Sequence, residues 1–64
     1  MDFAVFTAEQ LERLVRVEKS MADKAQKGYL ASMGTPHEAD MQKYAAEAFE
    51  RYYEVYGAWK SRTA

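Results

Sequence analysis

The segment Met33-Gly34-Thr35-Pro36 is the feature that most constrains the fold of this chain of 64 residues. Gly34 suits the left-handed backbone conformation that ends a helix, and Thr35 suits the cap of a following helix. Pro36 fits a first helical position, and Glu38 would complete a capping box with Thr35. Links this short join antiparallel helices that lie side by side. The segment therefore predicts a helical hairpin.

The first predicted helix covers about residues 8–33. Thr7 and Gln10 have the spacing of a capping box, which places the helix start at residue 8. Apolar and small residues recur at helical spacing along one face, and most charged residues fall on the opposite face. A helix with this pattern buries one face against a neighbour. The face to be buried consists of Leu11, Leu14, Val15, Met21, Ala22, Ala25, Tyr29, Ser32 and Met33.

The second predicted helix follows a turn at residues 34–35 and covers about residues 36–62. Its apolar residues form two adjacent rows, which together span about half of the helix circumference, whereas facing one neighbour requires only about 100°. We therefore expect this helix to contact more than its partner helix. The first row is Met41, Ala45, Ala48, Tyr52, Val55 and Trp59, and the second is Ala45, Phe49, Tyr52, Tyr56 and Trp59.

A reversal at Gly34 fixes how the two helices align. Residues whose numbers add to about 69 come level with each other, because both helices rise by the same amount per residue. Ala22 and Ala25 then face Ala45 and Ala48 in a closely packed seam. We predict one all-α domain, residues 1–64, folded as an antiparallel helical hairpin.

The length of the chain and its lack of cysteine make a lone hairpin difficult to stabilise. Two helices share one contact strip, and chains of this size usually need disulfides, metals or oligomerisation. The lack of cysteine excludes disulfides and fits a reducing compartment. We therefore expect a homodimer in which two hairpins form a four-helix bundle, with the aromatic residues of the second helix at the twofold interface.

Aromatic residues are concentrated in the second helix. Tyrosine and tryptophan combine a large apolar body with a polar tip, and they are common at interface hot spots. These rings could fill the hairpin core and a homo-oligomer interface, or they could form a surface for a different protein. In either case Phe49, Tyr53 and Tyr56 lie at the outer edge and are expected to point at a partner. The predicted protein interface is Phe49, Tyr52, Tyr53, Tyr56 and Trp59.

Glu18 lies in the centre of the apolar face of the first helix. A buried carboxylate needs a partner, and Arg51, Tyr52 and Tyr56 are level with it or one turn beyond. One interpretation is a structural polar contact that fixes the register or the oligomeric state. The alternative is a pocket whose carboxylate performs acid/base chemistry or binds a cation.

Glu47, Glu50 and Glu54 lie on one outer face of the second helix. Like charges at this spacing slightly disfavour a helix, so a basic partner surface would explain them. A solvated face is the simpler interpretation.

Charge and motifs exclude several classes of function. Nine Lys and Arg residues balance ten Asp and Glu residues, so no strong field attracts nucleic acid or an anionic membrane. The longest apolar run, residues 3–6, is far shorter than the roughly 20 residues of a membrane span. Catalytic and metal-binding motifs are lacking, so we expect a cytoplasmic protein that is not an enzyme and that needs no cofactor or metal.

The sequence thus favours a small non-catalytic protein–protein interaction module. Such a regulatory miniprotein would act as a self-associating helical hairpin, an adaptor or inhibitor of a larger macromolecule. The alternative function is a small-ligand-binding bundle with a polar site around Glu18, Tyr52 and Tyr56.

Overall fold

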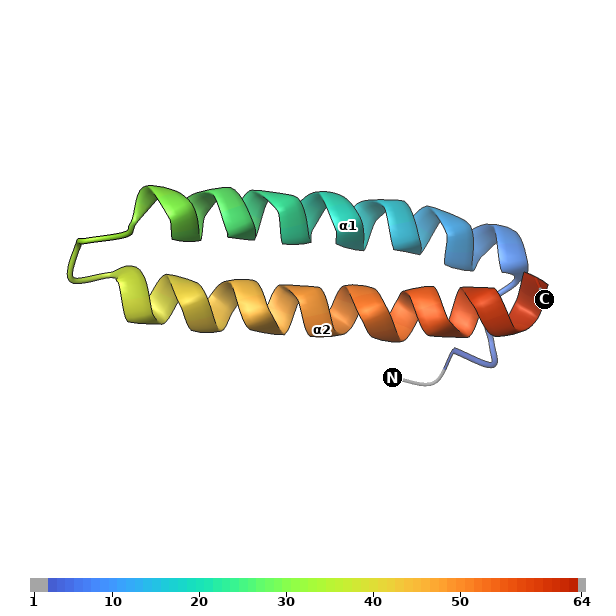
Figure 1. Ribbon diagram of the computed structural model, residues 1–64. Helices are drawn as coiled ribbons and strands as arrows, with labels where there is room; N and C mark the ends of the chain where they lie inside the picture. The colour runs from blue at the N-terminus through green and yellow to red at the C-terminus, as the bar shows by residue number, and fades with distance from the viewer. Residues whose placement is uncertain (1–2, 64) are drawn as a thin grey trace.

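The structure is a computed structural model that describes residues 3–63 and contains two α-helices packed against each other. Helix α1 spans Ala8–Ala31, and helix α2 spans Glu38–Thr63. Figure 1 shows the two helices running antiparallel and joined by a short turn, with the segment before α1 passing beside the C-terminal end of α2. The fold is the all-helical hairpin that the sequence predicted.

The hairpin is elongated. It measures 42 × 16 × 16 Å, and its radius of gyration is 13.8 Å, whereas a compact chain of this length would have a radius near ~11 Å. Its accessible surface is 4754 Å², compared with about 4,200 Å² for a typical globular protein of the same mass. The hairpin therefore leaves more of its surface in contact with solvent than a globular domain does.

The start of α1 is fixed by the predicted capping box. The Thr7 hydroxyl oxygen accepts a hydrogen bond from the Gln10 backbone N–H at 3.1 Å, and the Thr7 backbone N–H donates to Gln10 Oε1 at 2.9 Å. The two bonds satisfy backbone groups that an uncapped helix would leave without partners. This prediction is confirmed.

The turn between the helices is longer than predicted. Helix α1 ends at Ala31 and not at residue 33, and α2 begins at Glu38 and not at Pro36. The Ser32 hydroxyl donates to the Tyr29 carbonyl oxygen at 2.8 Å, which satisfies a carbonyl of the last turn and favours an end there. Gly34 has a φ of 82°, the left-handed conformation expected of it.

The second predicted capping box is wrong, because Thr35 uses its groups within the turn. Its backbone N–H donates to the Ser32 carbonyl oxygen at 3.0 Å, so this N–H is not free to bond the Glu38 carboxylate. Its hydroxyl donates to the same carbonyl and accepts the His37 backbone N–H at 3.3 Å. Thr35 therefore stabilises the turn, and residues 36–37 belong to it.

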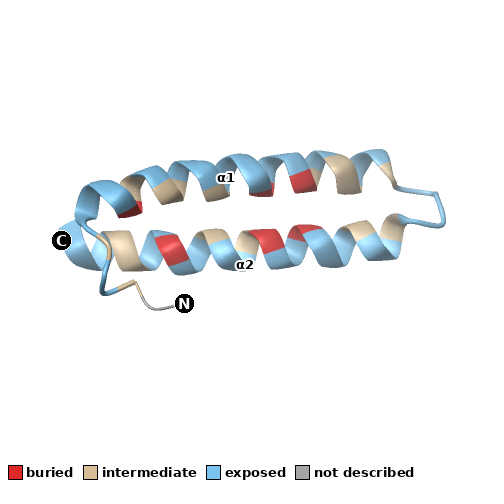
Figure 2. Cartoon of the chain, turned by 180° about the vertical axis from the view of Figure 1, so that it is seen from behind, coloured by how far each residue is buried: buried red, intermediate tan, exposed pale blue. Residues whose placement is uncertain are grey.

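The core is a strip between the helices, and its centre is a seam of alanines. Ala22 and Ala25 of α1 pack with Ala45 and Ala48 of α2, as predicted. Figure 2 shows that the buried residues of both helices face each other and that the outer faces are exposed. The buried hydrophobic residues of the described chain are Leu11, Ala22, Ala25, Ala45, Ala48 and Val55.

The register of the hairpin also agrees with the prediction. The Arg51 side chain reaches Glu18, and a Cβ added at Gly28 would lie 2.7 Å from the end of the Met41 side chain. In both pairs the residue numbers add to the value of about 69 that a reversal at Gly34 implies.

Met21 and Met33 are exposed, although the sequence placed them on the buried face of the first helix. Met33 follows the end of α1 and lies in the turn. Met21 lies at the edge of the apolar face, and α1 has only one neighbouring helix to cover that face. The strip that one helix covers is narrower than the apolar face that helical periodicity predicts.

Arg62 makes a contact that the sequence did not predict. Its guanidinium donates to the backbone carbonyl oxygens of Phe3 and Ala4, at 3.0 Å each, and to that of Phe6. The last turn of α2 thus holds the segment before α1 against the hairpin.

We predict that Ala48→Leu lowers the free energy of unfolding by about 1 to 3 kcal/mol, because the larger side chain does not fit the seam. Ala39→Leu is the matched control, since Ala39 is an exposed alanine of the same helix. Urea denaturation followed by circular dichroism at one fixed protein concentration measures both changes. Equal stability of the two variants would contradict close packing at Ala48.

Candidate protein-interaction surface

Five aromatic side chains form a continuous ladder along α2, here called the aromatic surface: Phe49, Tyr52, Tyr53, Tyr56 and Trp59. The rings of Phe49 and Tyr53 have centroids 6.2 Å apart, and those of Tyr52 and Tyr53 are 5.3 Å apart. Tyr52 and Tyr56 are separated by 5.9 Å, as are Tyr56 and Trp59. These distances are typical of favourable ring pairs, so the ladder is a preorganised surface.

The aromatic surface has an inner and an outer part. Phe49 and Tyr52 pack against the alanine seam, and they and Trp59 are half-buried. Tyr53 is 63% exposed and Tyr56 is 36% exposed. The inner rings therefore belong to the hairpin core, whereas Tyr53 and Tyr56 present apolar area that α1 does not cover.

Lys60 adds a cation to the end of this surface. Its ammonium nitrogen lies 5.7 Å from the ring centroids of both Tyr56 and Trp59. Such cation–π contacts fix a charged group over an apolar patch. A partner on this surface would meet rings and one positive charge.

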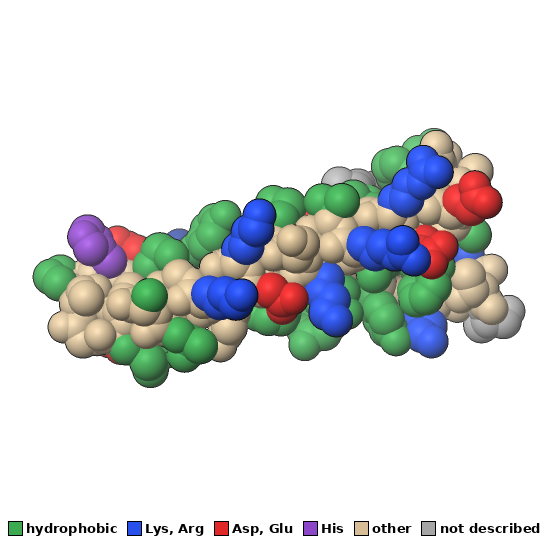
Figure 3. Space-filling view, turned by 90° about the horizontal axis from the view of Figure 1, so that it is seen from above, with side chains coloured by type: hydrophobic (Ala, Val, Ile, Leu, Met, Phe, Trp, Pro, Cys, Tyr) green, Lys and Arg blue, Asp and Glu red, His purple; other side chains and the backbone are tan. Residues whose placement is uncertain are grey.

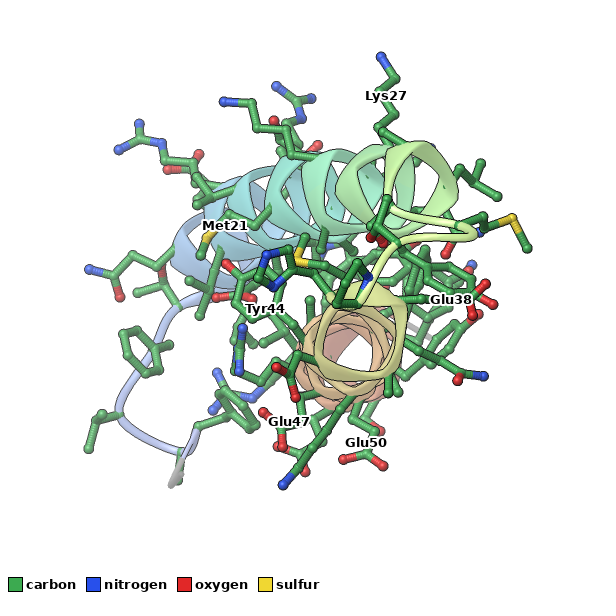
Figure 4. All side chains as sticks on the ribbon, turned by 90° about the vertical axis from the view of Figure 1, so that its left-hand side faces the viewer. Met21, Lys27, Glu38, Tyr44, Glu47 and Glu50 are labelled. Carbon is green, nitrogen blue, oxygen red and sulfur yellow. The ribbon has the colours of Figure 1, made fainter. Side chains whose placement is uncertain are left out.

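The two long sides of the hairpin differ. In Figure 4, Met21 and Tyr44 point to the side on which the segment before α1 lies. Tyr53 follows Tyr44 by nine residues, which is about two and a half turns at 100° per residue, so Tyr53 points to the opposite side. That opposite side is called the aromatic side below. Figure 3, a view onto α1, shows hydrophobic side chains along both long edges of the hairpin and charged side chains between them.

Glu18 and Arg51 are brought together by the hairpin register. Arg51 Nε lies 3.7 Å from Glu18 Oε2, and the side chains are 46% and 15% exposed, respectively. Glu18 Oε2 is buried and accepts no hydrogen bond. The contact is an ion pair without a hydrogen bond between a nearly buried carboxylate and a half-exposed guanidinium.

Glu47, Glu50 and Glu54 are all exposed on α2. Figure 4 shows Glu47 and Glu50 projecting away from α1. The three carboxylates therefore form an acidic outer face that the hairpin itself does not use.

The two mid-helix glycines have different surroundings. A Cβ on Gly28 would meet the Met41 side chain, so packing within the hairpin accounts for this glycine. A Cβ on Gly57 would meet no atom within 4 Å. A glycine inside a helix costs about 1 kcal/mol relative to alanine, and no contact within the hairpin offsets this cost at Gly57.

Residues 3–63 enclose no pocket, and no three of their His, Asp or Glu side chains are grouped to hold a metal ion. Neither helix has the length and apolar character needed to cross a bilayer. Comparisons with known protein families, with curated proteins and with solved structures find no match to the chain.

The sequence did not distinguish the exposed hydrophobic residues on the other side of the hairpin. Val17, Met21 and Tyr44 are each at least 42% exposed. Tyr44 belongs to the same aromatic-rich helix as Tyr53, but the two side chains point to opposite sides of that helix. No sequence signal for the Arg62 contact was available either, because it depends on where the N-terminal segment folds back.

We predict that Arg51→Met lowers the free energy of unfolding by about 1 to 2 kcal/mol, since it leaves the buried Glu18 oxygen without a charged neighbour. Glu18→Leu is expected to be neutral or stabilising, because an apolar side chain fills the same place without the desolvation penalty. Urea denaturation measures both values.

Arg16→Met is the matched control for Arg51→Met. Arg16 pairs with Glu12 at 3.1 Å, but its side chain is 77% exposed, so its loss should change stability by less than about 1 kcal/mol. If Arg51→Met is no more destabilising than Arg16→Met, Glu18 does not depend on Arg51.

Proposed function

We propose that this chain is a non-catalytic protein–protein interaction module whose contact surface is the aromatic surface of α2. In this proposal the hairpin self-associates as a homodimer in a four-helix bundle. The assembled bundle acts as an adaptor or inhibitor by covering part of a larger protein.

The observation that carries the proposal is the exposure of Tyr53 and Tyr56 within a packed ladder of rings. Large side chains held by their neighbours lose little conformational entropy on binding, which is why aromatic residues are common in interface hot spots. Phe49 and Tyr52 connect the ladder to the core, so contacts made outside would also reinforce the hairpin.

The acidic outer face supports a second contact of different chemistry. Glu47, Glu50 and Glu54 lie close together and are exposed, and a basic surface on a larger protein would relieve their mutual repulsion. In a bundle that buries the aromatic surface, Glu47 and Glu54 would remain outside and accessible. The adaptor or inhibitor role is therefore assigned to this face, and self-association is assigned to the aromatic surface.

A ligand site around Glu18, Tyr52 and Tyr56 is the second candidate function. The buried Glu18 oxygen without a hydrogen bond favours it. Arg51 already lies beside that oxygen, so the arrangement gives more support to a structural ion pair. Thermal shift with a panel of metabolites tests this candidate, and only ligand-induced stabilisation that Glu18→Leu abolishes would favour it.

We predict that Tyr53→Ala weakens self-association by at least about tenfold, because loss of a hot-spot ring costs 1 to 2 kcal/mol or more. Sedimentation equilibrium measures the dissociation constant. Tyr44→Ala is the matched control, since Tyr44 is an exposed tyrosine of the same helix on the opposite side. A wild-type chain that is monomeric and stably folded at micromolar concentration would refute the proposal.

The larger partner is tested by affinity purification and mass spectrometry from cells that express the chain. A protein captured by the wild type and by Tyr44→Ala, but lost with Glu47→Lys/Glu54→Lys, would support the acidic face as its contact. An unchanged set of captured proteins after this charge reversal would exclude that face.

A further inference from the structure

The aromatic side of the hairpin has charges that complement a second copy of the same chain. Lys19 lies about 160° around α1 from Met21, so it faces the aromatic side. Glu50 lies about 60° around α2 from Tyr53 and borders that side. Both residues are close to the midpoints of their helices and are exposed.

The dimensions of this side suit a dimer interface. The hairpin is 42 Å long and 16 Å wide. The area of one long side is therefore of the same order as the ~800 Å² that each partner buries in a stable protein complex. Gly57 is about 40° from Tyr53 around α2, and its open surroundings permit the close approach of another helix. No part of the hairpin fills the space beside Gly57, so a helix of another molecule can occupy it.

Two twofold arrangements can pair these sides. With the axis perpendicular to the helices, α1 packs on α1 and α2 packs on α2. With the axis parallel to the helices, α1 of each copy packs on α2 of the other, and all neighbouring helices are antiparallel.

The charges at the middle of the helices distinguish these arrangements. A perpendicular axis through the middle brings Lys19 near Lys19 of the second copy, and Glu50 near its Glu50. A parallel axis keeps residues at the same level, so Lys19 of each copy lies opposite Glu50 of the other. Like charges in the first case repel, and opposite charges in the second attract.

A second pair of charges agrees with the parallel axis. Along the hairpin, Glu12 is level with Gly57 and lies within one turn of Lys60. Around α1, Glu12 has the same angle as Leu30, which is exposed. Lys60 is held over the rings of Tyr56 and Trp59. In this arrangement Glu12 of one copy approaches Lys60 of the other beside the aromatic surface.

We propose that the occupant of the aromatic side is a second copy of this chain, related by a twofold axis parallel to the helices, with Lys19 opposite Glu50 and Glu12 near Lys60. This inference rests on the self-association in the proposed function and adds its geometry. Both turns then lie at the same end of the bundle, and each α1 contacts α2 of both copies.

Charge reversal tests the pairing of Lys19 with Glu50. Lys19→Glu and Glu50→Lys should each weaken the dimer by about tenfold, because each reversal creates two repulsive contacts per dimer. The double variant should return the dissociation constant to the wild-type value. Single variants that bind as tightly as the wild type would overturn the pairing.

A distance measurement tests the direction of the twofold axis. The chain has no native cysteine, so His37→Cys carries a single spin label in the exposed turn. Pulsed electron paramagnetic resonance should give a distance between labels of about 15 to 25 Å, because neighbouring helix axes in a bundle lie 8–10 Å apart. A perpendicular axis would separate the labels by roughly the 42 Å length of the hairpin.

The outcomes separate this inference from the proposed function. A dimer that depends on Tyr53 but has the long distance would overturn the parallel axis and leave the proposed function standing. A chain that remains monomeric at micromolar concentration would overturn both.

Discussion

The close contact between the alanines of α1 and α2 is the interaction on which the rest of this structure depends. Ala22, Ala25, Ala45 and Ala48 have small side chains that let the helices approach each other. Because stabilisation follows the apolar area that is removed from water, a seam of methyl groups contributes little by itself. The larger apolar side chains lie at the edges of the seam, where a single neighbouring helix covers them only in part.

Because of this division, large apolar side chains of the hairpin remain exposed. Phe49 and Tyr52 rest on the seam, and Tyr53 and Tyr56 extend the ladder outward. Tyr53 and Tyr56 are exposed on this side. The acidic residues Glu47 and Glu50 point away from α1. The molecule thus separates an aromatic surface, proposed for self-association, from an acidic face, proposed for another protein.

Most of the fold could be predicted from the sequence because local signals and helical periodicity determine it. The Thr7 and Gln10 capping box, the alanine seam and the register all follow from spacing alone. The candidate ion pair between Glu18 and Arg51 follows from the same register. Each of these features depends on residues that are close in sequence or on one reversal.

The remaining features depend on competition among groups or on three-dimensional position. Thr35 could cap a helix or stabilise the turn, and the Ser32 carbonyl decides the outcome by accepting from it. Met21 is an apolar residue at a spacing typical of the core. It is exposed because the one neighbouring helix does not cover the whole apolar face of α1. Arg62 binds the segment before α1 across the whole chain. The composition and residue spacing of the sequence therefore do not predict these contacts.

We propose that the hairpin alone is an incomplete fold, which association stabilises. Thermal unfolding of the wild-type chain at concentrations from about 1 to 500 μM tests it most directly, because the midpoint of a coupled dimer rises with concentration. We predict a midpoint that increases steadily across this range, together with a rise in helical circular dichroism. The same midpoint and the same helicity at every concentration would contradict the claim.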